Sequence, residues 1–114
     1  MHTLALLHYD NLKSDIDKHI YGKYEHTDCG FLTILHTNQN GLQIKKNNEW
    51  VDYNTPYDNF TVIVGDTLQD ISNNIYKAVT HRVLIKHEKY SVAFFFELGN
   101  KKGTFCEKQM KTKI

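Results

Sequence analysis

Three residues in two parts of the chain have the types and spacing of a metal site. The stretch "EHTDCG" at residues 25–30 places His26 and Asp28 two positions apart. In a strand, residues i and i+2 point to the same side, so this imidazole and this carboxylate would face one ligand together. His81, in "THRV", lies inside an apolar, β-branched run, where a histidine needs a partner. Two histidines and one carboxylate that leave coordination positions open suit non-haem Fe(II).

Each part of this pattern also has a simpler interpretation. A His-x-Asp pair can occur by chance in a polar turn. His81 alone could be a core histidine whose ring nitrogens are hydrogen-bonded to their neighbours. Cys29 has the opposite strand parity to His26 and Asp28, so we expect it to pack rather than to act as a ligand. The residues alone therefore leave a metal site and unrelated polar features both open.

The segments around these residues predict an all-β domain. Asn40-Gly41 and Asn47-Asn48 are tight-turn signals between apolar runs, because both residue types tolerate positive φ. Helical patterns at 14–20 and 67–74 are short. We expect both faces of the "VIV" and "FFF" runs to be buried, in a sandwich or barrel with few or no helices. Runs with strand character occupy residues 3–9, 31–37, 42–46, 49–53, 59–66, 78–85 and 90–98.

Composition limits the classes of partner. A chain of 114 residues is the size of one domain. Its net charge of +1 lacks the basic footprint of a nucleic-acid-binding protein. The N-terminal "LALL" is too short for a signal peptide or a membrane span. Cys29 and Cys106 form no Cys-x-x-Cys pair. We therefore expect a cytoplasmic protein with free thiols and with neither a nucleic-acid nor a membrane partner.

A longer series of segments carries a family resemblance. The chain reads "LALLHYD … EHTDCGFLTIL … GLQI … EWVDY … NFTVIVGDTLQDISNN … KAVTHRVL … EKYSVAFFFEL". In order and spacing, from about residue 4 to residue 98, this resembles the isopenicillin N synthase-like family of Fe(II)- and 2-oxoglutarate-dependent dioxygenases. The resemblance implies a double-stranded β-helix, a cupin-like jelly roll, over residues 1–100, followed by a basic C-terminal tail at 101–114.

The resemblance also implies the site residues. His26, Asp28 and His81 would be the catalytic Fe(II) ligands. The family binds the far carboxylate of 2-oxoglutarate with an Arg-x-Ser motif, and this chain has Lys89-Tyr90-Ser91 there. Tyr9, in "LLHYD", would line the cosubstrate pocket. Because lysine offers a point charge rather than a planar fork, we expect weaker or differently selected binding of the keto acid.

The implied activity is the oxidation of a small organic substrate, by hydroxylation or desaturation, with decarboxylation of 2-oxoglutarate to succinate. Ascorbate is a candidate reductant. Family members carry an N-terminal half with helices that these 114 residues lack, so the activity of the short chain alone stays open. An uncovered sheet face would favour self-association. The alternatives are a truncated, non-catalytic β-helix module acting in binding or assembly, and an oxygenase that does not use 2-oxoglutarate.

Overall fold

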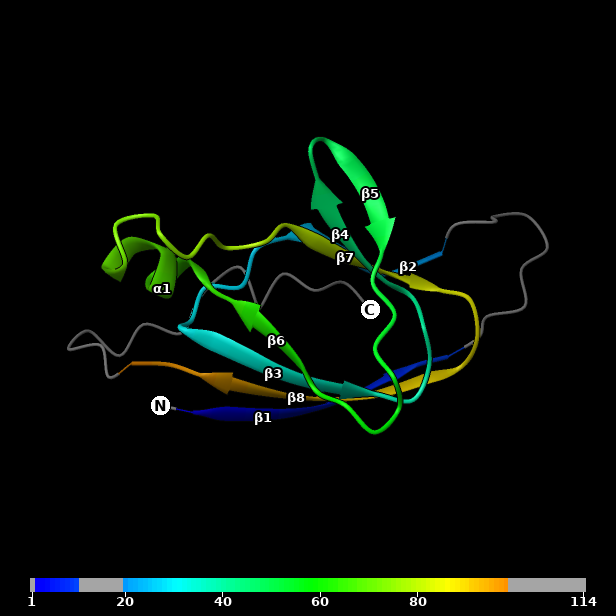
Figure 1. Cartoon of the computed structure of the whole chain (residues 1–114). Helices are drawn as coiled ribbons and strands as arrows, with labels where there is room; N and C mark the ends of the chain where they lie inside the picture. The colour runs from blue at the N-terminus through cyan, green and yellow to red at the C-terminus, as the bar shows by residue number, and fades with distance from the viewer. Residues whose placement is uncertain (1, 11–19, 99–114) are drawn as a thin grey trace.

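The computed structural model describes residues 2–10 and 20–98, and within them two four-stranded antiparallel sheets face each other (Figure 1). One sheet has the strand order β1-β8-β3-β6 and the other β2-β7-β4-β5. This is the all-β, jelly-roll arrangement that the sequence predicts. The elements are β1 (Thr3–Tyr9), β2 (Ile20–His26), β3 (Leu32–Thr37), β4 (Leu42–Lys46), β5 (Glu49–Asp52), β6 (Thr61–Val64), α1 (Asp66–Ile71), β7 (His81–Ile85) and β8 (Lys89–Phe96).

The β1-β8-β3-β6 sheet has one buried face and one exposed face. In β6 the buried Thr61 and Ile63 flank Val62, which is 57% exposed. In β8 residues 89, 91 and 93 are buried and residues 90 and 92 are exposed. The prediction that both faces of the "VIV" run are buried is therefore wrong, and so is the same prediction for "FFF", whose three rings are only half-buried. Among the described residues, both apolar and polar side chains are buried between the sheets, and most of the outer face is exposed apart from contacts such as those of Tyr57 and Phe60 with His36.

The two turn signals have different outcomes. Asn47 and Asn48 take φ values of 52° and 63° and join β4 to β5, which confirms the predicted hairpin. Asn40-Gly41 instead connects strands of different sheets, because β3 pairs with β6 and β8 while β4 pairs with β5 and β7. Gly41 has φ 138°, and a Cβ on it would overlap the carbonyl oxygen of Leu84. This glycine is needed where the chain passes from one sheet to the other.

Two further differences concern the region before the site. The sequence analysis misses β2, because "IYGKYEH" lacks the continuous β-branched character of the other strands. Asp28 lies beyond the end of β2, in a loop, rather than within a strand.

The short helical pattern at 67–74 is present as α1. Residues 14–19 and the tail at 101–114 lie outside the described residues. None of the described helical residues forms a segment long and apolar enough to span a membrane.

A close contact between two glycines holds the loop that carries Asp28. A Cβ on Gly65 would overlap the carbonyl oxygen of Gly30. The backbone N–H groups of residues 65, 66 and 67 donate to the carbonyl oxygens of Phe31, Asp28 and Gly30 over 3.0, 2.7 and 3.1 Å. The corner between β6 and α1 therefore fixes the backbone of residues 28–31, and only a glycine allows the two segments to approach this closely.

We expect Gly65→Ala to lower the free energy of unfolding by about 1–3 kcal/mol, because the added methyl group meets a backbone atom that has little room to move. Urea unfolding followed by circular dichroism measures the change. Gly30→Ala is the matched control, since its Cβ would meet the nearest atoms, in Glu97 and Phe96, at 3.1 Å. A Gly65→Ala chain as stable as the wild type, or more stable than Gly30→Ala, would contradict this account.

Candidate metal and cosubstrate site

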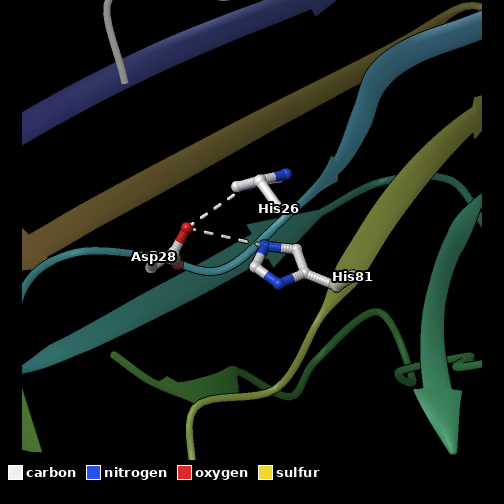
Figure 2. Close-up of side chains that lie close together, drawn as sticks. All are labelled: His26, Asp28 and His81. Atoms are coloured by element: carbon white, nitrogen blue, oxygen red, sulfur yellow. Dashed lines mark ion pairs between the residues drawn. The ribbon is translucent and has the colours of Figure 1, made fainter. Parts of the chain in front are cut away.

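The structure brings together the three residues that the sequence proposes as metal ligands (Figure 2). His26 ends β2, His81 begins β7, and the two are direct partners in the antiparallel register. Cross-strand partners project to the same side, so the ring centroids lie 4.2 Å apart. In the loop after β2, Asp28 Oδ1 lies 3.4 Å from His26 Nε2 and 3.5 Å from His81 Nε2. One carboxylate oxygen therefore faces two imidazole nitrogens.

Backbone carbonyls orient both histidines. The Nδ1 atom of His26 lies 2.7 Å from the carbonyl oxygen of Tyr24, and that of His81 lies 2.9 Å from the carbonyl oxygen of Val79. A carbonyl only accepts, so in each neutral ring Nδ1 carries the proton and donates it. Each Nε2 then keeps a lone pair that faces the Asp28 carboxylate. This is the tautomer with which a neutral histidine binds a metal through Nε2.

Asp28 is ionised and held in place. Its side chain is 2% exposed, and Thr33 Oγ1 donates to its Oδ2 over 2.6 Å. Burial would raise the pKa of this carboxyl group, but the imidazoles of His26 and His81 and the Thr33 hydroxyl outweigh burial and lower the pKa to about 2. Burial lowers the pKa of His81, although Asp28 partly opposes this effect. An ionised carboxylate beside a neutral imidazole is the protonation state that a metal cation requires.

The donor set fits a divalent transition metal. The 3.4 and 3.5 Å separations exceed an ordinary hydrogen bond of about 2.7–3.2 Å. Two ligands that lie about 2.1 Å from one ion at a right angle are about 3 Å apart. His26 Nε2 is buried and has no hydrogen-bond partner among the described residues. A buried, unpartnered nitrogen is costly unless a ligand meets it. Two imidazoles and one carboxylate are a donor set suited to Fe(II).

The residues expected at the cosubstrate end lie on β1 and β8. Tyr9 and Lys89 are direct partners in the register, so their side chains project to the same face. Lys89 Nζ lies 6.0 Å from the centroid of the Tyr9 ring. Ser91, two positions along β8, is buried on this face, and its hydroxyl donates to Thr37 Oγ1 over 3.1 Å. Lys89 and Ser91 are both buried, while Tyr90 between them is exposed, so the two polar side chains share the inner face of β8.

Lys89 is a buried cation without a counterion among the residues that the structure describes. Its side chain is 2% exposed, and no carboxylate of the described residues lies within 4.0 Å of its Nζ. Burial lowers the pKa of Lys89 to about 8, so in most molecules the amine is still protonated at neutral pH. An uncompensated buried ammonium destabilises the fold, and an anionic ligand would remove that cost.

A mostly apolar cavity, whose wall also includes Tyr53, Thr61 and Lys77, lies one strand away from His81. It has a volume of about 210 Å³ and lies between β4 and β6, where Leu42, Ile44, Ile63 and Val79 contribute to its wall. Ile44 is the register partner of His81 on the side opposite β2. The cavity therefore places mostly apolar space one strand away from one of the three candidate ligands.

One expectation about a neighbouring residue needs revision. Cys29, expected to be a free thiol, is disulfide-bonded; Cys106 lies outside the described residues. Arg82 follows His81 in β7 and has a structural role. It donates from Nε to Gln43 Oε1 over 2.8 Å, and its guanidinium carbon lies 4.0 Å from the centroid of the Trp50 ring. Arg82 thus holds the outer side of β7 rather than contacting the candidate site.

Sequence reasoning missed residues that support the site. Thr33, which orients Asp28, is a single hydroxyl residue in the apolar run "FLTIL", and this exception was the available signal. Gly22 makes room for a cosubstrate-side residue, since a Cβ there would overlap the Tyr9 ring. Lys23 lies on β2, the strand that the sequence analysis misses. Its position relative to the site follows from the pairing of β2 with β7.

Comparisons with known proteins agree with this geometry. The family model of the 2OG-Fe(II) oxygenase superfamily matches residues 2–98. The chain is 39% identical over 79 residues to Gibberellin 2-beta-dioxygenase 7 of Arabidopsis thaliana, a match that covers 67% of this chain and 24% of that protein. It is 35% identical over 104 residues to the 2-oxoglutarate-Fe(II) type oxidoreductase hxnY of Emericella nidulans, covering 86% of this chain and 30% of that one.

Solved structures share the fold. Dioxygenase for auxin oxidation 1 from Arabidopsis thaliana, in complex with 2-oxoglutarate, matches with a TM-score of 0.78 and 27% identity, over 91% of this chain and 40% of that chain. A full-length Neurospora crassa protein in complex with alpha-KG matches with a TM-score of 0.78 and 32% identity, over 84% of this chain and 36% of that chain. This chain thus spans well under half the length of these relatives. From its fold, its matched residues and its relatives, the chain belongs to the 2OG-Fe(II) oxygenase superfamily.

Proposed function

We propose that this chain forms the metal- and cosubstrate-binding core of an Fe(II)- and 2-oxoglutarate-dependent dioxygenase. Its activity would oxidise a small organic molecule, by hydroxylation or desaturation, and convert 2-oxoglutarate into succinate and CO2. The observation that carries the proposal is the convergence of two imidazole nitrogens on one buried carboxylate oxygen, with His26 Nε2 left without a hydrogen-bond partner in the part of the chain that the structure describes. A chain that retained only the scaffold would have no need to keep this arrangement.

His26, Asp28 and His81 would hold Fe(II). Bound there, the metal would supply a site where the keto acid and dioxygen meet and the substrate is oxidised. The protein's part is to orient the ligands. The carbonyl oxygens of residues 24 and 79 fix the ring tautomers, and Thr33 occupies Asp28 Oδ2 so that Oδ1 faces the two rings.

Lys89, Ser91 and Tyr9 would bind the far carboxylate of 2-oxoglutarate. The Lys89 ammonium supplies the charge that a carboxylate seeks in a buried site. The Ser91 hydroxyl donates to Thr37 in the absence of a ligand and can rotate to donate to a carboxylate oxygen. The Tyr9 ring, which lies beside Lys89, would line this end of the site.

The prime substrate would be a small molecule with an apolar part. The 210 Å³ cavity one strand away from His81 has mostly apolar walls and suits such a group. The names of the relatives refer to small molecules, among them gibberellin and auxin. These names describe the relatives, and for this chain they support the class of substrate only.

The outer face of the β1-β8-β3-β6 sheet would bind a second copy of the chain. In the register Leu4, Phe94, Ile34 and Val62 form a row across all four strands. Leu4 is 63% exposed and Leu6, in the next row, is 77% exposed. The described strand residues of this face include no Lys, Arg, Asp or Glu, so two copies could meet without repulsion between like charges.

The metal assignment is tested with His81→Ala. We expect the variant to lose tight Fe(II) binding, because one of three protein ligands is gone, while the far-ultraviolet circular dichroism spectrum stays that of a β protein. Anaerobic calorimetric titration with Fe(II) gives the affinity. His36→Ala is the matched control, since His36 lies on the outer face and contacts the Tyr57 carbonyl oxygen. Retention of wild-type Fe(II) affinity by His81→Ala would rule out this metal centre.

Lys89→Met should have two opposite effects, because methionine matches the lysine stem without its charge. Loss of a charged hydrogen bond should weaken 2-oxoglutarate binding to the Fe(II)-loaded chain about 10- to 100-fold. Removal of an unpaired buried charge should raise the ligand-free chain's stability by up to a few kcal/mol. Calorimetry and urea unfolding measure the two quantities. Lys86→Met, at an exposed lysine 3.8 Å from Asp52, is the control. Unchanged 2-oxoglutarate affinity in Lys89→Met would place the carboxylate elsewhere.

Leu6→Lys should convert associated chains to monomers, because a charge at this position cannot be buried against a second copy without a partner. Sedimentation velocity over a range of concentrations follows the change. Tyr76→Lys is the control, since Tyr76 is 58% exposed but lies outside the sheet. A wild-type chain that is monomeric throughout, or association that survives Leu6→Lys, would exclude this face as the contact.

A further inference from the structure

Lys23 places a second ammonium group on the metal side of the space between the sheets. It lies on β2, three residues before His26, and is the register partner of Val83 on β7. Val83 is 7% exposed and shares the inward face of β7 with His81. The register shifts on both sides of Lys23, but Lys23 and Val83 lie opposite each other and cross-strand partners project to the same side, so the half-buried Lys23 side chain points toward the interior. Next to it, Gly22 lies against Tyr9, so this part of β2 also borders the cosubstrate end.

Within residues 2–10 and 20–98, this lysine has no carboxylate paired with it. It is partly buried, and no carboxylate of the described residues lies within 4.0 Å of its Nζ. Burial lowers its pKa, while the charge of Asp28 acts in the opposite direction. The Lys23 charge in turn contributes to lowering the pKa of His81. The ammonium therefore lies close enough to the candidate ligands to interact with them electrostatically, but it is not paired with Asp28.

The charge balance of the interior points to an anion. Lys23 and Lys89 contribute two positive charges and Asp28 one negative charge, and a divalent metal ion would add two positive charges. A dicarboxylate cosubstrate contributes two negative charges, so one positive charge is left over. Uncompensated charge in a buried site is costly. A further anionic group, or a direct contact from Lys23 to the cosubstrate, would lower that cost.

We propose that the Lys23 ammonium binds a carboxylate on the metal side of the space between the sheets. The inference rests on the proposed function and adds to it a specificity-determining residue. The carboxylate has two possible sources, which share the same chemistry. It is either the keto acid end of 2-oxoglutarate or the carboxylate of a prime substrate that is itself a small organic acid. The first source makes Lys23 part of cosubstrate binding, and the second makes it the residue that selects an acidic substrate.

Two titrations of the Fe(II)-loaded full chain under anaerobic conditions distinguish the sources. The first adds 2-oxoglutarate, and the second adds straight-chain monocarboxylates from acetate to decanoate to the chain already saturated with 2-oxoglutarate. Calorimetry reports both affinities. We expect Lys23→Met to weaken one of them about tenfold or more, the size of one lost charged hydrogen bond. Weakening in the first titration assigns the cosubstrate, and weakening in the second assigns an acidic substrate.

Two variants serve as controls. Lys23→Arg keeps the charge and should keep most of the affected affinity, which separates a role of the charge from general damage to the fold. Lys86→Met removes a surface lysine and should change neither titration. The inference is overturned if Lys23→Met keeps wild-type 2-oxoglutarate affinity and the monocarboxylates either bind it as they bind the wild type or bind neither chain. A wild-type chain that binds neither Fe(II) nor 2-oxoglutarate would instead overturn the proposed function itself.

Discussion

The arrangement of the site depends on the pairing of the end of β2 with the start of β7. This pairing sets His26 opposite His81, and both rings donate from Nδ1 to carbonyl oxygens two residues earlier in their own chain segments. The histidines therefore need no side-chain partner to be oriented. Asp28 is positioned separately, by the β6–α1 corner and by Thr33. The site therefore depends on one strand pair and on a loop that a separate set of hydrogen bonds holds in place.

The sequence predicts an element correctly where the preferences of its own residues agree with the strand pairing of the fold. β1 and β4 have the bounds expected from their apolar runs, and Asn47-Asn48 forms its hairpin because positive φ is a property of the residue itself. Asn40-Gly41 has the same local signal but joins two sheets. The choice between a hairpin and a crossing depends on which strands pair, and pairing partners are distant in the sequence. β2 was missed for the same reason, since its stability comes from β7 rather than from its own composition.

The same distinction, between a residue's own chemistry and its distant partners, applies to the residues of the candidate site. His26, Asp28 and His81 could be proposed because metal ligands must have particular side chains, and these are visible in a sequence. Lys89 and Ser91 came from the resemblance to the family's Arg-x-Ser motif, and residues two apart in a strand share a side. Thr33, Gly65 and Lys23 could not be ranked from the sequence, because each acts through a partner that only the fold supplies. Thr33 meets Asp28, Gly65 meets Gly30, and Lys23 faces the interior through its pairing with Val83.

The buried charged and polar groups of the ligand-free interior lower the stability of the fold. The stability of the fold is therefore linked to ligand binding. Lys89 is 2% exposed without a counterion, and His26 Nε2 is buried without a hydrogen bond among the described residues. Each feature lowers the stability of the fold, and a protein that bound no ligand could avoid that loss with an apolar residue at the same position. A metal ion would satisfy the nitrogen and a carboxylate would satisfy the ammonium, so both costs would fall together when ligands bind. Because a ligand that binds only the folded state stabilises it, the same groups that weaken the empty fold would make the loaded one more stable. An interior of this kind is better explained by ligand binding than by packing alone.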